Sequence, residues 1–169
     1  TTEQIRQRFD NDVERFSNLQ TGQSATIDAP LALELIAQAA TITNPRARHV
    51  LDVGCGAGNY TLKLLQSLPD LDVTLVDLSQ PMLGRAVERI RQVSSGRITS
   101  LQGDIRELTF GDDHFDIVLA AAVLHHLRQE SEWLSVFSTF YSILKPGGSL
   151  WISDLIEHST PRGQTLMRK

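Results

Sequence analysis

Three closely spaced glycines follow a short apolar segment and constrain the fold more than any other feature. Residues 49–53 form the apolar segment, and Gly54, Gly56 and Gly58 come directly after it. Glycine lets a backbone turn tightly and approach a ligand where a Cβ atom would collide. A helix that begins at such a turn presents free N–H groups and the positive end of its dipole. The junction therefore predicts a strand, a ligand-binding turn and a helix in succession.

Strand and helix patterns alternate from residue 48 onward. Short β-branched, apolar runs predict strands, and apolar residues spaced by one helical turn predict helices. The expected strands are 49–53, 72–77, 97–101, 115–120 and 149–153, and the expected helices are 60–68, 79–93 and 131–144. This alternation is typical of an α/β, doubly wound, mainly parallel sheet. The crossover rule gives the strand order 3-2-1-4-5 and places ligands at the carboxyl ends of the strands.

The chain before residue 48 has a helical pattern of its own. Ile5, Phe9, Val13 and Phe16 recur at about one helical turn, which predicts one amphipathic helix. A polar loop is expected over 18–26, and Asp28 with Pro30 is typical of a helix start. We therefore expect an N-terminal helical segment over 1–45 and a core domain over 46–169.

Composition and charge disfavour several classes of protein. The chain has 169 residues, 41% apolar and 21% charged, as one soluble globular domain would have. No apolar run approaches the roughly 18 residues of a membrane span. A net charge of -4 leaves no basic surplus for phosphate backbones, so no nucleic-acid partner is expected. Cys55 is the single cysteine, which excludes an intrachain disulfide and favours a cytoplasmic protein.

The glycine spacing distinguishes between cofactors. Dinucleotide-binding turns need glycines at offsets 0, 2 and 5, whereas this turn has them at 0, 2 and 4, with Asn59 at offset 5. Asp77 ends the second expected strand, where a carboxylate can accept hydrogen bonds from both hydroxyls of a ribose. The alternatives are a tight turn without a ligand and a helix-capping Asp77. Together, the turn and Asp77 indicate a ribose-bearing cofactor other than NAD or FAD.

The segment from Leu51 to Gly58 resembles motif I of the class I, Rossmann-like S-adenosylmethionine-dependent methyltransferases. That motif is an acidic residue followed by G-x-G-x-G, and Asp52 fills the acidic position. Segments 103–105, 115–127 and 144–148 are similar to later motifs of the family, so the resemblance extends over residues 48–154. It implies a methyltransferase of the small-molecule type that binds S-adenosyl-L-methionine and releases S-adenosyl-L-homocysteine.

The resemblance also implies a set of cofactor-binding residues. In relatives, the residue at Asp104 meets the adenine amino group, Ile105 packs on the ring, and Met82 lies beside the adenine or ribose. No metal is implied. The implied cofactor-binding residues are Asp52, Gly54, Cys55, Gly56, Gly58, Asp77, Leu78, Met82, Asp104, Ile105 and Ala120.

Catalytic residues are harder to assign, because in-line transfer from a sulfonium needs mainly orientation. His125 and His126 follow the fourth strand, and either ring could act as a general base. Packing at a helix start and lining of a substrate pocket are the alternatives. Cys55, between glycines, fits a small filler better than a nucleophile. The aromatic stripe of the last helix is expected to be core: Trp133, Phe137, Phe140 and Tyr141.

Methyl transfer to a small-molecule acceptor is the expected function, and two alternatives stay open. Segments 9–16 and 103–106 resemble carboxy-S-adenosylmethionine synthase, which modifies the cofactor. The other alternative is a non-catalytic cofactor-binding module that contacts another protein. A homodimer is also left open.

The family resemblance predicts a feature at each end of the chain. Relatives usually finish with two further strands, whereas this chain ends at Lys169, soon after the fifth strand. We therefore expect a C-terminally truncated core, because the fifth strand would otherwise be an exposed edge. In relatives an N-terminal segment folds over the cofactor cleft, so residues 1–17 are expected to form a lid. A helix docked permanently away from the site is the alternative.

Overall fold

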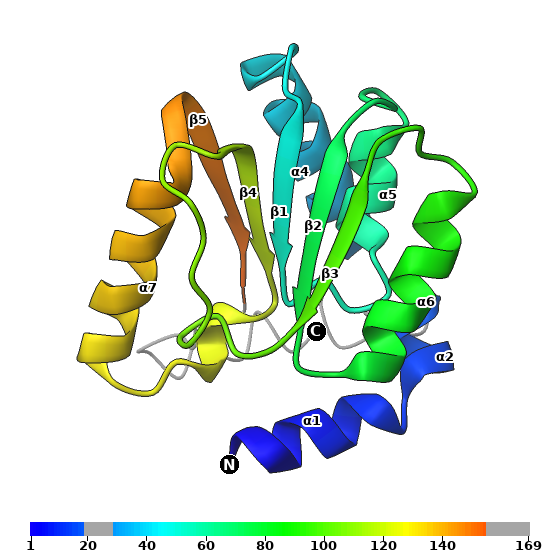
Figure 1. Cartoon of the computed structure of the whole chain (residues 1–169). Coiled ribbons are helices and arrows are strands. Elements are labelled where there is room, and N and C mark those ends of the chain that lie inside the picture. Colours follow the sequence, from blue (N-terminus) through cyan, green and yellow to red (C-terminus); the bar gives the residue numbers. More distant parts are fainter. Residues whose placement is uncertain (19–28, 155–169) are drawn as a thin grey trace, which may run out of the picture.

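The computed structural model describes residues 1–18 and 29–154. Within them, five parallel strands form one sheet in the order β3-β2-β1-β4-β5 (Figure 1). The predicted fold class and strand order are thus confirmed. The strands are β1 (His49–Val53), β2 (Asp72–Asp77), β3 (Ile98–Gln102), β4 (Phe115–Ala121) and β5 (Leu144–Ser153).

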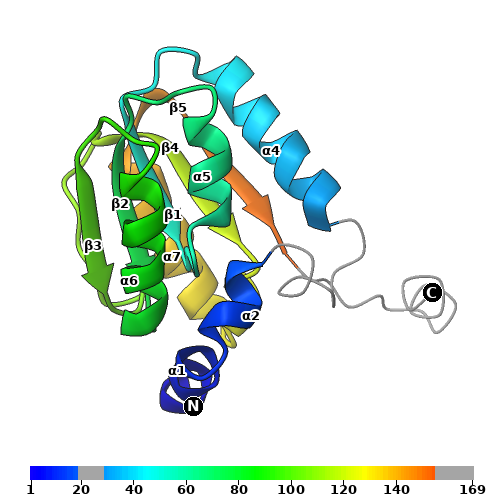
Figure 2. The same cartoon turned by 90° about the vertical axis from the view of Figure 1, so that its right-hand side faces the viewer.

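Helices cover both faces of the sheet, with α4, α5 and α6 on one face and α7 on the other (Figure 2). Successive strand residues point to opposite faces, so Val50 joins the α4–α6 core and Leu51 joins the α7 core. The helices are α1 (Thr2–Asp10), α2 (Val13–Ser17), α4 (Ala29–Thr43), α5 (Asn59–Leu65), α6 (Gln80–Arg91), the short 3-10 helix η1 (Leu124–His126) and α7 (Glu130–Ile143).

Helix α6 illustrates how local sequence sets these boundaries. The Ser79 hydroxyl accepts the Met82 N–H as an N-cap, and Pro81 occupies the first turn. Met82, Ala86 and Ile90 are buried as expected. Val93 was expected to extend that stripe, but it lies beyond the helix end and is 54% exposed.

The N-terminal segment forms two helices where one was expected. Helix α1 ends at Asp10 and α2 begins at Val13, with polar Asn11 and Asp12 capping the two ends. Asn and Asp favour caps over helix interiors, because their side chains compete for backbone groups. The break brings the Phe9 and Phe16 rings to 5.1 Å between centroids. The polar loop expected over 18–26 and the helix start at Asp28 fall almost entirely outside the described residues.

The aromatic stripe of α7 is largely exposed, so that expectation was wrong. Only Phe140 of the stripe is buried, while Trp133, Phe137 and Tyr141 are 37%, 39% and 87% exposed. Helix α7 contacts the sheet through its buried residues Val136, Phe140 and Ile143. The helical spacing of the apolar residues was therefore correct, but the side of α7 that faces the core only partly coincides with the aromatic stripe.

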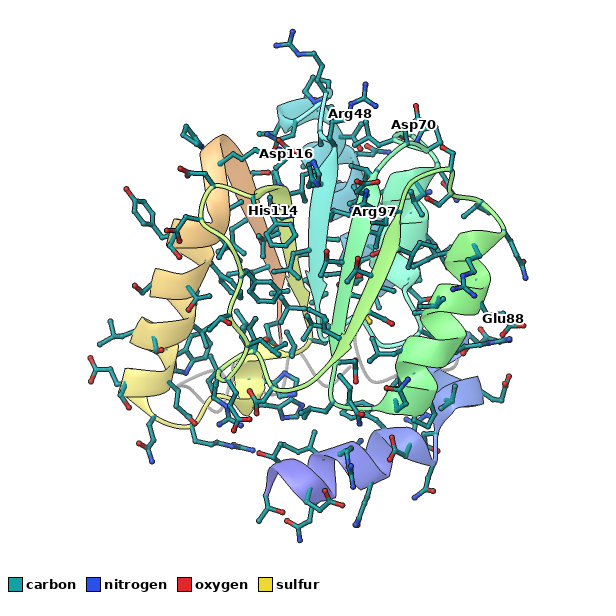
Figure 3. All side chains as sticks on the ribbon, viewed as in Figure 1. Arg48, Asp70, Glu88, Arg97, His114 and Asp116 are labelled. Atoms are coloured by element: carbon teal, nitrogen blue, oxygen red, sulfur yellow. The ribbon has the colours of Figure 1, made fainter. Side chains whose placement is uncertain are left out.

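The opposite edge of the sheet, away from the carboxyl ends, is closed by polar contacts. Asp116 of β4 accepts the backbone N–H groups of Arg48 and His49, each at 2.9 Å, and pairs with Lys145 of β5 (Figure 3). The Pro146–Gly148 turn interrupts the β4–β5 pairing, where the paired residue jumps from Leu144 to Ser149. The expected turn is therefore present inside the strand.

Candidate functional site

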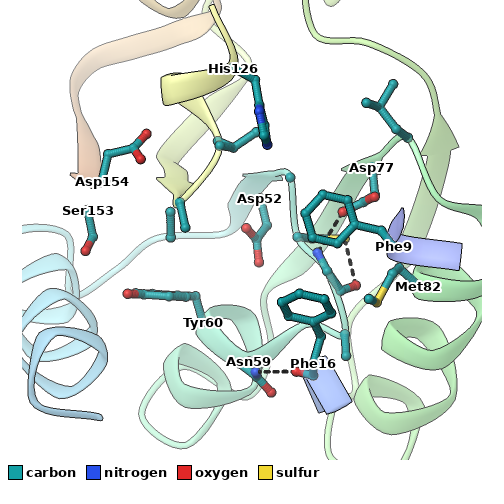
Figure 4. Close-up of a pocket in the computed structure, with 18 of the residues that line it drawn as sticks. Phe9, Phe16, Asp52, Asn59, Tyr60, Asp77, Met82, His126, Ser153 and Asp154 are labelled. Atoms are coloured by element: carbon teal, nitrogen blue, oxygen red, sulfur yellow. Dashed lines mark hydrogen bonds between the residues drawn. The ribbon is translucent and has the colours of Figure 1, made fainter. Parts of the chain in front are cut away.

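A cavity of about 300 Å³ opens at the carboxyl edge of the sheet. This volume is at the lower end of the range of about 300–1,000 Å³ typical of ligand pockets. The walls come from the glycine turn, the ends of β2 and β5, the segment after β4, and helices α1 and α2 (Figure 4). The cavity therefore lies where the sheet topology predicts a ligand site.

Each glycine of the turn has a positive φ, and each meets a different demand. The φ angles of Gly54, Gly56 and Gly58 are 65°, 51° and 80°. A Cβ on Gly54 would lie 2.5 Å from Cγ2 of Val123, whereas one on Gly56 would meet no atom within 4 Å. Gly56 lines the cavity, so its missing side chain leaves room there. Gly58 lets α5 approach α6, because a Cβ there would lie 3.1 Å from Ile90.

Asp77 connects the end of β2 to the glycine turn. Its Oδ2 accepts the Gly56 N–H at 2.8 Å, and its Oδ1 accepts the Ser79 N–H at 2.9 Å. Burial raises the pKa of this carboxyl, and hydrogen bonds from the backbone N–H groups of Ser79, Gly56 and Leu78 oppose the rise. Each carboxylate oxygen has a second acceptor site. Asp77 can therefore hold the turn and still accept hydrogen bonds from a ligand in the cavity.

Asp52 is a second buried carboxyl on the cavity wall. It is 2% exposed, and the Thr61 hydroxyl donates to its Oδ2 at 2.7 Å. Burial raises the pKa of Asp52 to about 7, and the charge of Asp77 adds to the rise. Two carboxyls at one wall disfavour an anion beside them and favour a cationic ligand group.

A smaller cavity of about 50 Å³ adjoins the first and shares Gly54, Asp77 and Leu78 with it. Asp104 and Ile105 line this smaller cavity. The Arg106 guanidinium bonds to the Asp104 carboxylate and holds its pKa below the usual range.

The structure brings most of the sequence-predicted cofactor residues to these two cavities. Cys55 and Met82 line the larger one. Burial raises the Cys55 pKa well above its usual value, which suits the expected role of a small filler. Gly58 and Ala120 line neither cavity, and Ala121 and Ala122 lie there in place of Ala120.

The N-terminal helices lie across the larger cavity. Ile5, Arg8 and Phe9 of α1 line it, as do Arg15 and Phe16 of α2. Hydrogen bonds attach the segment to the core at three places. Asn59 donates to the Phe16 carbonyl at 3.2 Å, the Ser79 hydroxyl donates to the Asp10 carboxylate at 2.5 Å, and the Arg106 guanidinium donates to the Thr2 hydroxyl at 3.2 Å. The sequence pattern indicated an apolar stripe but gave no signal for Arg8 or Arg15.

Polar side chains that follow β4 and β5 form the other side of the cavity. His125 and His126 line it together with Tyr60, Ser153 and Asp154. Neither ring nitrogen of His126 has a hydrogen-bond partner among the described residues. Burial is the main cause that lowers the His126 pKa. Sequence reasoning missed Asp154, although the strand-end rule that selected Asp77 also applies to the residue after β5.

Other kinds of site have less support in the described part of the chain. There, no cluster of three or more His, Cys, Asp or Glu side chains is suited to a metal ion. No described helix is long and apolar enough to cross a membrane.

Comparison with known proteins places this geometry in a family. The methyltransferase domain family model matches residues 50–148. YqeM of Bacillus subtilis, named as a methyltransferase, is 34% identical over 107 residues, which are 63% of this chain and 42% of that protein. A demethylmenaquinone methyltransferase of Listeria welshimeri is 29% identical over 117 residues, 69% of this chain and 48% of that protein. The chain thus spans less than half the length of these two relatives.

The fold has counterparts among solved structures. The N-methyltransferase NodS of Bradyrhizobium japonicum, solved with S-adenosyl-L-homocysteine, is 22% identical with a TM-score of 0.68. The match covers 85% of this chain and 71% of NodS, and at this identity it shows a shared fold. With the family match over 50–148, the conclusion is that the chain belongs to the class I, S-adenosylmethionine-dependent methyltransferase family.

Proposed function

We propose that this chain binds S-adenosyl-L-methionine and transfers its methyl group to a small-molecule acceptor by in-line displacement. The observation that carries the proposal is the junction of Asp77 with the glycine turn at one cavity wall. It combines a carboxylate acceptor for ribose hydroxyls with a backbone that leaves room for the ligand.

The cavity fits this cofactor in charge and in shape. When bound, S-adenosyl-L-methionine supplies a methyl group on a positively charged sulfonium with a neutral thioether as the leaving group. The Asp77 carboxylate, which accepts two backbone N–H groups, and above about pH 7 the Asp52 carboxyl give the wall the negative charge that a cationic ligand needs. Asp104 and Ile105 would contact the adenine from the smaller cavity, and Met82 would pack beside it.

The remaining space suits a small acceptor with an apolar body. Phe9, Phe16 and Val123 give this space apolar walls, and the two histidines with Tyr60 give it polar groups. A cavity of about 300 Å³ is of the size that binds small molecules. One relative carries the name demethylmenaquinone methyltransferase, and the acceptor in that name is a small molecule and not a macromolecule.

Of the N-terminal segment at 1–45, helix α4 packs into the core of the domain at 46–169, so in this proposal α1 and α2 act as the lid. The part that lies over the cavity, α1 and α2, is attached by a few contacts and has no fully buried residue. Such a segment can open for ligand entry and close to exclude water.

The direct test is formation of S-adenosyl-L-homocysteine from S-adenosyl-L-methionine with a panel of small phenols, alcohols, amines and thiols. We expect acceptor-dependent product, and the same reaction with Asp77→Ala as a control should be strongly reduced. Cofactor binding without turnover of any acceptor would favour a non-catalytic module. Mass spectrometry of the ligand that copurifies would reveal a carboxymethyl cofactor if the chain modifies the cofactor instead.

A further inference from the structure

His125 and Asp154 form a bidentate pair on the acceptor side of the cavity. Oδ1 of Asp154 lies 2.6 Å from Nδ1 of His125, and Oδ2 accepts the backbone N–H of the same histidine at 3.0 Å. The two residues follow β4 and β5, which are neighbours in the sheet. Both line the cavity that Asp77 and the glycine turn line from the other side.

This pairing determines which ring nitrogen of His125 carries the proton. A carboxylate only accepts hydrogen bonds, so the neutral ring must place its proton on Nδ1 to bond with Asp154. The lone pair is then on Nε2, and no described residue bonds to that atom. The His125 side chain is 31% exposed and lines the cavity, so a ligand there can approach the ring.

His126 has no comparable carboxylate partner among the described residues. It lies 4.1 Å from His125 between ring centroids, but neither of its nitrogens bonds to a described group. Its tautomer is therefore not fixed by a partner. Its ring forms a T-shaped pair with Phe9 of α1, with 6.4 Å between centroids, which suits a pocket wall.

We propose that His125 is the general base that takes a proton from the acceptor, and that Asp154 is the positioning residue that fixes its tautomer and orientation. The inference rests on the proposed methyl transfer. It deepens that function by naming the acceptor class, since a base is useful only for a nucleophile that must lose a proton.

The acceptor's nucleophilic O or N atom forms a bond to the methyl carbon, and the electron pair of the broken carbon–sulfur bond stays on sulfur. The proton of the acceptor passes to Nε2 of His125, and the resulting imidazolium returns that proton to water. The Asp154 carboxylate, hydrogen-bonded to Nδ1, stabilises the imidazolium. The acceptors are thus phenols, alcohols or N–H compounds, and not tertiary amines or thioethers.

An Asp154→Asn substitution should reverse the tautomer because both carboxylate oxygens are in use. The backbone N–H of His125 needs an acceptor, so the amide oxygen would face it. The amide NH₂ would then face Nδ1, which must accept, and the ring proton would move to Nε2. A ring protonated at Nε2 cannot take the acceptor's proton.

The first measurement needs no acceptor. Nitrogen chemical shifts of the His125 imidazole, recorded by NMR on the full chain at a pH where the ring is neutral, report the tautomer directly. We expect the Nδ1–H form in the unsubstituted chain and the Nε2–H form in Asp154→Asn. The matched control is Asp113→Asn, which changes an exposed turn residue with positive φ before β4, a conformation that Asn tolerates.

The second measurement separates binding from transfer. Asp154→Asn and His125→Gln should bind S-adenosyl-L-homocysteine as the unsubstituted chain does. Their kcat with phenol or alcohol acceptors should fall by about 10²–10⁴-fold, the usual contribution of a general base. Asp113→Asn should retain both properties.

Three results would overturn the assignment of base and positioning residue. These are an unchanged His125 tautomer in Asp154→Asn, an unchanged kcat in that variant, and turnover confined to tertiary amines or thioethers. If the unsubstituted chain failed to bind S-adenosyl-L-homocysteine, the proposed function itself would be contradicted, whatever the tautomer.

Discussion

The carboxylate of Asp77 accepts the backbone N–H of Gly56 across 2.8 Å, which links the end of β2 to the middle of the glycine turn. The two residues are far apart in sequence, yet they share one wall of the cavity. A ligand that bonds to Asp77 must therefore pass close to the backbone at Gly56. Substitutions at the two positions should disturb the same ligand by different physical routes.

Gly56→Val should weaken S-adenosyl-L-homocysteine binding at least as much as the loss of a hydrogen bond to the charged Asp77 would, which is about 1.5–3 kcal/mol. A Cβ at this position would meet no protein atom within 4 Å, and because Gly56 lines the cavity, a valine side chain should occupy space there. The φ of +51° also strains a β-branched residue. Calorimetric titration measures the loss at a temperature where the variant is folded.

The control for Gly56→Val is Gly84→Ala, at an exposed position of α6 with open space around it. It should leave the affinity unchanged and stabilise the fold by about 0.5–1 kcal/mol, since alanine loses less backbone entropy in a helix. If Gly56→Val bound the ligand as well as the control does, the cavity beside Gly56 would not be the cofactor site.

Asp52→Asn should remove a pH dependence of stability. The Asp52 pKa is about 7 in the folded chain and 3.8 in an ordinary Asp. Between those values the unfolded carboxyl ionises while the folded one stays protonated. The unfolded state then binds fewer protons, and the free energy of unfolding falls as pH rises. Below about pH 3.8 Asp52 does not lower the free energy of unfolding. Above about pH 7 it lowers that free energy by its full amount.

Urea unfolding at pH 5 and pH 8 measures this effect. The free energy of unfolding should fall by about 1.4 kcal/mol per pH unit while only the unfolded carboxyl is ionised. Between pH 5 and pH 8 the Asp52 carboxyl should therefore lower that free energy by about 3 kcal/mol. The difference in unfolding free energy between Asp52→Asn and the unsubstituted chain should therefore grow toward pH 8. The exposed control Asp112→Asn should show no such growth. A difference that is equal at both pH values would show that Asp52 is already ionised at pH 5.

Deleting residues 1–17 should leave a folded core that binds cofactor but transfers the methyl group slowly. These helices have no fully buried residue, so the hydrophobic clusters on the two faces of the sheet stay intact. They line the cavity, so their loss admits water and removes part of the acceptor wall. Hydrogen exchange should also show residues 1–17 gaining protection when S-adenosyl-L-homocysteine binds. If the chain without residues 1–17 unfolded, or if hydrogen exchange of residues 1–17 did not change when the ligand binds, the helices would be structural.

The strands β1, β2 and β4 were predictable from sequence because they are largely buried on both faces. Such strands are near-continuous apolar runs that end at glycine or Asp, and the β1 and β2 boundaries agree with the expected ones. Right-handed crossovers then leave few strand orders to choose from. Asp77 was predictable for the same reason, since it ends a strand at the edge where ligands bind.

Features that depend on neighbouring elements were not predictable from local patterns. A helical stripe records which residues are apolar but not what covers them, so exposed Tyr141 was assigned to the core. The break at Asn11 reorients Phe16, which one continuous stripe cannot indicate. Asp154 belongs to no motif, and its contact with His125 can be recognised only in the folded chain, where the ends of β4 and β5 lie side by side.

Calorimetric titration of Asp77→Ala with S-adenosyl-L-homocysteine tests the cofactor site most directly. The matched control is Asp112→Ala, an exposed loop position. The unsubstituted chain and the control should bind with equal affinity, and Asp77→Ala should lose about 1.5–3 kcal/mol, because a charged acceptor for the ligand is removed. Equal affinity in all three proteins would place the ribose elsewhere and contradict the assigned site.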